Sequence, residues 1–142
     1  MKTNRALNME LRRLVEARLQ QTLRGIEDTL NQIIADQETT VRELKEDLKS
    51  LEPSFNILLQ KWSLEILYTL FLKTATGFGE LKKILGVNSR TLSDKLKTLK
   101  HHGYIERDVN TGPPLRVNYR LTPKGKNIVL LALPLLYYSS QP

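Results

Sequence analysis

The sequence predicts a mainly α-helical protein with one small β-hairpin, in which a compact domain follows a long amphipathic helix of the coiled-coil type. Apolar residues recur at steps of three or four through the first fifty residues, which is the period of an amphipathic helix. Shorter segments with the same period follow between residues 54 and 102. Two segments with alternating apolar residues, at 104–109 and 116–121, are joined by turn-forming residues, as in a hairpin.

Composition limits the class of protein. With 142 residues, the chain is long enough for one compact core plus an extension. It contains no cysteine, which excludes disulfides, a thiolate nucleophile and a cysteine-based zinc site. The first residues lack the apolar core of a signal peptide, and no apolar run approaches the roughly 18 residues of a membrane span. We therefore expect a cytoplasmic protein that does not enter a membrane.

The positive charge is concentrated after Pro53. Residues 1–53 contain 9 Lys and Arg against 10 Asp and Glu, a net charge of −1. Residues 54–142 contain 13 against 5, a net charge of +8. A basic domain beside a balanced one is typical of proteins that bind polyanions such as nucleic acids.

Residues 1–53 are expected to form a long helix that ends at Pro53. A single helix of about 45 residues would extend roughly 68 Å, too far to bury its apolar stripe on one small domain. We therefore expect it to serve dimerisation by pairing with a second copy of the chain, and a hairpin folded near Thr39 and Thr40 is the alternative. A membrane-binding helix is disfavoured because the segment has no aromatic residue and a net charge near zero. The stripe consists of Leu7, Leu11, Leu14, Val15, Leu19, Leu23, Ile26, Leu30, Ile33, Val41, Leu44, Leu48 and Leu51.

Two helices are expected directly after Pro53. Ser54 is the predicted cap of the first, over 54–73, which the residues TATG then end. The second covers 78–85, and Gly86 supplies the turn that follows it. The side chains expected to face the core are Phe55, Leu58, Leu59, Trp62, Ile66, Leu67, Leu70, Phe71, Phe78, Leu81, Ile84 and Leu85.

A third helix, over residues 89–102, has two distinct faces. Asn88 or Ser89 is the expected cap, and Gly103 follows the last turn. Leu92, Leu96 and Leu99 share one face and are expected to pack inward. The opposite face carries hydrogen-bond donors and charges, namely Arg90, Thr91, Ser93, Asp94, Lys95, Lys97 and Thr98.

The predicted hairpin has the turn-rich tip NTGPPL, and Arg107, Arg116 and Arg120 flank it. Thr122 and Pro123 then begin a last helix. Its apolar part, residues 127–142, is expected to contribute to packing and dimerisation, and Pro134 is expected to kink or end it.

This order of elements is that of a winged helix-turn-helix domain, here over residues 54–126. The helix over 89–102 would then enter the major groove of double-stranded DNA, and the wing over 104–121 would follow the adjacent backbone or minor groove. Arg90 could read guanine, Asp94 could accept from cytosine or orient Arg90, and Lys95 and Lys97 could contact phosphates. The complete set of expected DNA-binding residues is Ser89, Arg90, Thr91, Ser93, Asp94, Lys95, Lys97, Thr98, Arg107, Arg116 and Arg120.

The sequence resembles the HxlR-type winged helix-turn-helix transcriptional regulators, which are relatives of the MarR-type winged helices. The resemblance covers about residues 55–130, through KWSLEILYTL, FGELKKILGVNSRTLSDKLKTLKHHGYIERDV and PPLRVNYRLTPKG. It implies a homodimeric regulator whose recognition helix includes residues 90–97. Gln60 stands where the family usually has glycine, no sensing cysteine is present, and the N-terminal helix is longer than usual. These departures argue against a redox or reactive-aldehyde signal.

Other function classes are less well supported. His101 and His102 are adjacent and cannot chelate a metal together without other ligands. No hydrolase, zinc-protease or phosphate-loop motif accompanies them. We therefore expect no catalysis, no metal and no cofactor. A winged helix used for protein binding would have a neutral or acidic face, whereas four basic residues oppose Asp94 alone between 89 and 102. Sequence-tolerant, chromatin-type DNA binding stays open as an alternative to site-specific regulation. Nothing in the residues points to a small-molecule effector.

Overall fold

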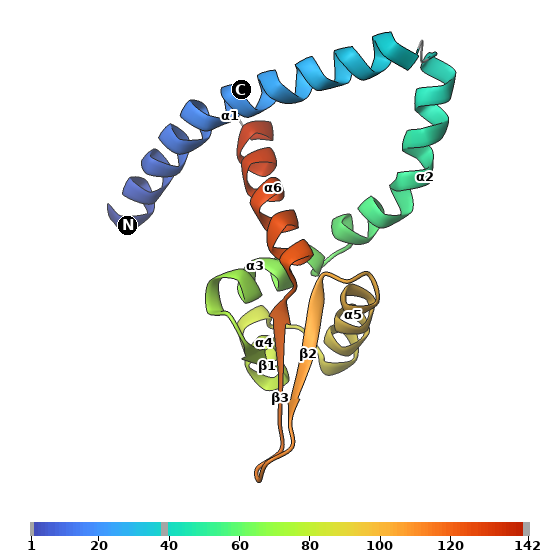
Figure 1. The fold of residues 1–142 in the computed structure, drawn as a ribbon. Helices are drawn as coiled ribbons and strands as arrows, with labels where there is room; N and C mark the ends of the chain where they lie inside the picture. The colour runs from blue at the N-terminus through green and yellow to red at the C-terminus, as the bar shows by residue number, and fades with distance from the viewer. Residues whose placement is uncertain (1, 38–39, 141–142) are drawn as a thin grey trace. The chain divides into compact units, whose positions relative to one another are not determined.

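A computed structural model describes residues 2–37 and 40–140 of the chain. It divides into two compact units, Met1–Lys49 and Ser50–Pro142. The elements follow in the order α1 (Lys2–Gln37), α2 (Val41–Leu59), α3 (Ser63–Lys73), β1 (Thr76–Gly77), α4 (Phe78–Leu85), α5 (Ser89–His101), β2 (Ile105–Asn110), β3 (Arg116–Leu121) and α6 (Pro123–Ser139) (Figure 1). The mainly helical fold with a β-hairpin and a long N-terminal helix is confirmed. Within the described residues, none of the helices combines the length and the apolar character needed to cross a membrane.

Residues 1–53 do not form one continuous helix, because α1 ends at Gln37 and α2 begins at Val41, next to the point at which the alternative placed a break in the helix. Thr40 begins α2 with a reciprocal pair of hydrogen bonds. The Glu43 backbone N–H donates to Thr40 Oγ1 at 3.2 Å, and the Thr40 N–H donates to Glu43 Oε2 at 3.5 Å. This capping box satisfies N–H groups that a helix start leaves unpaired. Thr39, the other residue at which a hairpin was considered, lies outside the described residues.

The expected helix boundary at Pro53 and Ser54 is also wrong, because α2 continues through Pro53 to Leu59. The chain turns instead at residues 60–62. The Ser63 N–H donates to the Gln60 carbonyl at 3.2 Å, and Trp62 adopts a left-handed backbone with φ 77°. Leu58 is buried and Trp62 is half-buried against the core. Packing of these side chains, rather than the local proline signal, therefore decides where the helix ends.

The core of the second unit is built from α3, α4 and α5 together with the strands. Ile66, Leu67 and Leu70 of α3 are buried. Leu81 of α4 is also buried, as are Leu92, Leu96 and Leu99 of α5. Phe55, Leu59 and Ile84 were expected to face inward and instead are 51%, 63% and 46% exposed. The turn at residues 60–62 interrupts the face to which Phe55 and Leu59 were assigned.

The sheet has the strand order β1-β3-β2 with antiparallel pairing, and β2 and β3 form the expected wing. In its register, Arg107 lies opposite Tyr119 and Glu106 lies opposite Arg120. Strand β1 was not expected. Thr76 pairs with Tyr119 and is buried, so this short segment ties the wing to the start of α4.

Helix α6 begins where the sequence predicted. Thr122 caps it by accepting a hydrogen bond from the Gly125 N–H at 3.0 Å. Gly125 packs so closely on the backbone just before β2 that an added Cβ would lie 2.0 Å from the Tyr104 carbonyl oxygen. Pro134 does not end the helix, which extends to Ser139.

Candidate nucleic-acid interface

Helix α5 is fixed to the domain at its start and along its inner face. The Asn88 side chain accepts a hydrogen bond from the Thr91 backbone N–H at 2.8 Å, so Asn88 is the cap of this helix. Before it, Gly86 ends α4 with φ 66°, a left-handed conformation that glycine adopts without strain. Leu92, Leu96 and Leu99 then anchor the helix in the core. Helices α4 and α5 and the turn between them form the helix-turn-helix unit.

The face of α5 away from these leucines is accessible. Ser89, Arg90, Asp94 and Lys97 are exposed, and Thr91, Ser93, Lys95 and Thr98 are half-buried. The Thr98 hydroxyl donates to the Asp94 carbonyl within the helix at 3.0 Å. Most predicted DNA-binding residues of the helix therefore share one accessible surface.

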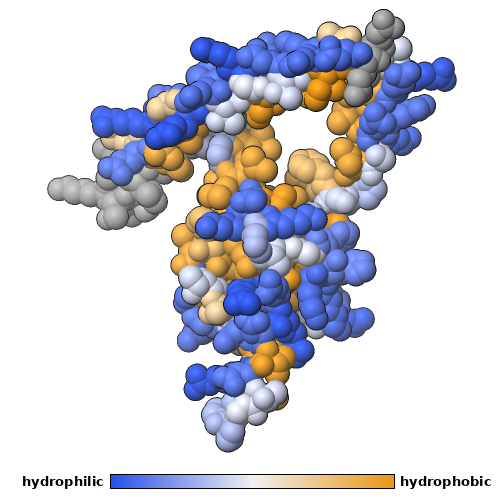
Figure 2. Space-filling view, viewed as in Figure 1, coloured by the Kyte–Doolittle hydropathy of each residue, from blue (hydrophilic) through white to orange (hydrophobic). Residues whose placement is uncertain are grey.

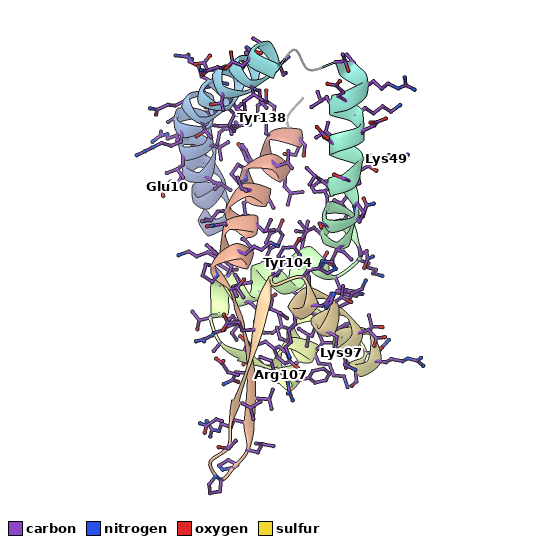
Figure 3. All side chains as sticks on the ribbon, turned by 45° about the vertical axis from the view of Figure 1, so that its right-hand side comes forward. Glu10, Lys49, Lys97, Tyr104, Arg107 and Tyr138 are labelled. Carbon is purple, nitrogen blue, oxygen red and sulfur yellow. The ribbon has the colours of Figure 1, made fainter. Side chains whose placement is uncertain are left out.

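An open groove of about 370 Å³ lies between α5 and the wing. Its charged lining residues are Lys97 and Lys100 of α5 and Arg107 of β2, and no acidic residue lines it. Ser93, Leu96 and Tyr119 complete the lining. Figure 3 labels Lys97 and Arg107 on their two elements. The fold thus brings a wing arginine and the basic side of α5 to one concave, positively charged surface, which we call the α5–wing groove.

The other wing arginines lie on the other face of the sheet, because side chains alternate along a strand and Arg107 pairs with Tyr119 rather than with Arg120. Arg120 forms ion pairs with Glu106 at 3.0 Å and with Asp108 at 3.1 Å. The hydrogen bond that Arg120 donates to Glu106, helped by the charge of Asp108, raises the pKa of the Arg120 guanidinium. Arg116 is exposed at the start of β3, next to the tip. Arg120 is therefore engaged within the wing, whereas Arg116 is accessible.

Lys95 has a specific partner in the domain. Its Nζ donates to Gln60 Oε1 at 2.8 Å, which links the middle of α5 to the turn between α2 and α3. No local sequence pattern indicates this contact. Because an ammonium group carries three N–H donors, Lys95 keeps two for another partner while Gln60 holds the third.

Three residues of the groove, Leu96, Lys100 and Tyr119, were absent from the predicted set, and Leu96 was assigned to the core. Lys100 lies on the accessible side of α5, three residues after Lys97, and this helical spacing could have included it. Tyr119 had no comparable signal, because its place in the groove depends on the register between β2 and β3.

A helix-turn-helix followed by a two-stranded wing, with the exposed face of the second helix basic, defines a winged helix-turn-helix domain. A model of the HxlR-like helix-turn-helix family matches residues 57–139, more than half of the chain. The chain therefore belongs to this family of winged-helix regulators.

The relatives it resembles carry names of the same kind. An HTH-type transcriptional regulator of Synechocystis sp. is 41% identical over 81 residues, which cover 55% of this chain and 59% of the relative. YvaP of Bacillus subtilis, also named an HTH-type transcriptional regulator, is 37% identical over 76 residues, which cover 53% of this chain and 69% of YvaP. The match thus spans less than two thirds of the Synechocystis relative's length.

Solved structures show the same fold. The reduced form of the transcriptional regulator YodB from B. subtilis matches with a TM-score of 0.60 and 25% identity, over 65% of this chain and 90% of YodB. A MarR-family regulator from Enterococcus faecalis matches with a TM-score of 0.60 and 28% identity, over 65% of this chain and 84% of that structure.

Proposed function

We propose that the protein binds double-stranded DNA as a homodimer and regulates transcription, with α5 in the major groove and the wing on the adjacent backbone or minor groove. The observation that carries the proposal is the α5–wing groove, where Lys97, Lys100 and Arg107 converge without an acidic neighbour in the lining. The phosphate backbone of DNA is the partner that such a concave basic surface attracts most strongly.

The first turns of α5 and the groove suggest different roles. Arg90, in the first turn of α5, is exposed and can form the bidentate contact that arginine makes to guanine. Thr91, Ser93 and Asp94 follow on the same helix and can reach base edges or phosphates. Lys97 and Arg107 are better suited to phosphates, because they line the groove together. Arg120 contributes indirectly, by holding the wing through Glu106 and Asp108.

The rest of the chain is assigned to dimerisation. Among the described residues, the segments 1–53 and 127–142 carry apolar side chains that are more than half exposed, including Leu30, Leu131 and Leu135 at 51%, 68% and 59%. A two-fold dimer would present two copies of α5 about 34 Å apart, which matches successive major grooves on one side of the duplex.

The test is selection of bound fragments from a random DNA pool at physiological salt, followed by footprinting of the selected site. We expect a palindromic site with two protected half-sites, and Arg90→Ala should weaken its binding by about 1 to 3 kcal/mol and relax the preference at one position per half-site. Lys126→Ala removes an exposed positive charge from α6, away from the groove, and serves as the control. Enrichment of no sequence despite strong binding would instead support the sequence-tolerant alternative, and no binding at low salt would refute the proposal.

A further inference from the structure

Helix α2 carries an apolar stripe whose spacing is more regular than that of any other helix in the described part of the chain. Val41, Leu44, Leu48, Leu51, Phe55 and Leu58 follow one another at steps of three, four, three, four and three. Leu58 is buried in the core, but Val41, Leu48, Leu51 and Phe55 are 84%, 53%, 63% and 51% exposed. In Figure 2 hydrophobic side chains occupy one edge of α2 and hydrophilic ones the opposite edge.

This spacing is the heptad pattern of a two-helix seam, in which the five residues from Val41 to Phe55 named above occupy the a and d positions, whereas Leu58, at the next d position, belongs to the core. Pro53 then falls at position f, which points away from a partner helix. A proline at that position lies outside the seam and faces solvent. Because proline has no backbone N–H, one carbonyl of the preceding turn lacks its helical hydrogen bond, and on this side of the helix water can reach that carbonyl. The one residue of α2 that is unfavourable inside a helix therefore lies on the side opposite the stripe.

We propose that α2 pairs with α2 of a second copy of the chain in an antiparallel seam centred between Lys49 and Ser50. This inference rests on the proposed homodimer and adds its polarity and register. In such a seam Leu48 packs in one layer with Leu51 of the partner subunit, and Leu44 packs in one layer with Phe55 of the partner subunit.

The charges beside the stripe select this polarity. Lys45 and Glu52 occupy e positions, and Asp47 occupies a g position. In an antiparallel pair e faces e, so Lys45 meets Glu52 of the partner subunit, and symmetry provides this ion pair twice. In a parallel pair g faces the next e, so Asp47 would meet Glu52 of the partner subunit, and symmetry would repeat this repulsion.

The same register gives the DNA-binding domains a suitable separation. Leu59 ends α2 and leads into the domain. In the antiparallel seam the two Leu59 residues are 19 residues apart along the axis, which at 1.5 Å per residue places them about 30 Å apart. One turn of B-DNA is about 34 Å. A parallel seam would instead hold the two chains about 10 Å apart at this point, the usual distance between packed helices.

Cross-linking tests the polarity directly, because the natural chain contains no cysteine. Leu44→Cys and Phe55→Cys are made in separate full-length chains, one of them with a mass tag, then mixed, allowed to exchange subunits and mildly oxidised. We expect the mixed disulfide between Cys at 44 and Cys at 55 to dominate, with little disulfide-linked homodimer of either variant. The reason is that an antiparallel seam separates identical positions by about 16 Å along the axis. Lys49→Cys, on the outer side of α2, is the control and should not cross-link.

Predominant homodisulfides would show a parallel seam and overturn the proposal. If the variants fold and no disulfide forms, another occupant, such as α1 of the same chain, covers the stripe and the proposal is equally wrong. Under either of these outcomes, a protein that is still dimeric and binds its DNA site retains the proposed function. A monomer that does not bind DNA would refute both the seam and the proposed function.

Charge exchange provides a second test that keeps the apolar seam intact. Lys45→Glu or Glu52→Lys alone should raise the dimer dissociation constant about 2- to 30-fold, as expected for two exposed ion pairs. The double exchange should restore the dimer to near its original affinity, measured by analytical ultracentrifugation at low salt. If the double variant is as weak as the single variants combined, the Lys45–Glu52 pairing across the seam is refuted.

Discussion

Replacing Lys97 by Gln should change the salt dependence of DNA binding by a predictable amount. Lys97 is exposed and lines the α5–wing groove beside Lys100 and Arg107. If it contacts one phosphate per subunit, a dimer loses two phosphate contacts. The slope of log K against log salt concentration should then fall in magnitude by about 1.8, since each phosphate contact contributes about 0.9.

This difference is large enough to measure. Between 50 and 200 mM salt, the wild-type protein should lose about 12-fold more affinity than Lys97→Gln, which follows from a slope difference of about 1.8 over 0.6 log units. Fluorescence anisotropy with the selected duplex, titrated at four or more salt concentrations, gives the slope. The site preference should stay the same, because a phosphate contact does not identify a base.

The control is Lys126→Gln, which removes the same charge outside the groove. It should shift the slope little, because Lys126 is not among the residues that line the groove. A Lys97→Gln slope equal to that of wild type would refute a phosphate contact. A changed base preference with an unchanged slope would assign Lys97 to base recognition instead.

Substitutions at three further positions probe the fold that holds the groove. Asn88→Ala removes the cap of α5 and should lower the free energy of unfolding by about 1 kcal/mol in urea denaturation, whereas Asn88→Asp should preserve it. Gly125→Ala forces a Cβ against the Tyr104 carbonyl and should destabilise the domain by about 1 to 3 kcal/mol or more; a thermal midpoint like that of wild type would contradict the close contact. Burial, helped by Glu65, raises the pKa of Tyr68, so the folded state keeps its proton to higher pH than the unfolded state. Stability should therefore fall as pH rises above about 10, and Tyr68→Phe should reduce this fall without loss of stability at neutral pH, since the buried Tyr68 hydroxyl makes no hydrogen bond to any residue that the structure describes.

The elements with a strong local pattern were predictable. Leu92, Leu96 and Leu99 follow the helical period and are all buried, and Thr122 with Pro123 begins α6 as expected. The wing strands also match, because alternation and a turn-rich tip depend on neighbouring residues. A local signal was overlooked at Thr40, where Glu43 three residues later completes a capping box.

Local signals misled where packing opposed them. Pro53 indicated a helix end, yet α2 continues past it to Leu59, and the turn follows where Leu58 and Trp62 meet the core. Pro134 likewise lies inside α6. A proline removes one backbone hydrogen bond and strains the preceding turn, which makes a helix interior unfavourable for proline without excluding it.

The sequence by itself determined the succession of helices and strands, the inner and outer faces of α5, and the concentration of positive charge after Pro53, since each depends on residues within a few positions of one another. The tertiary structure alone decided that Arg107 joins the basic side of α5, that Arg120 is held by Glu106 and Asp108, and that Lys95 reaches Gln60. These contacts depend on strand register and on how separate elements pack. Lys95 and Gln60 are 35 residues apart in the sequence. They become neighbours only when the core has fixed both segments in space.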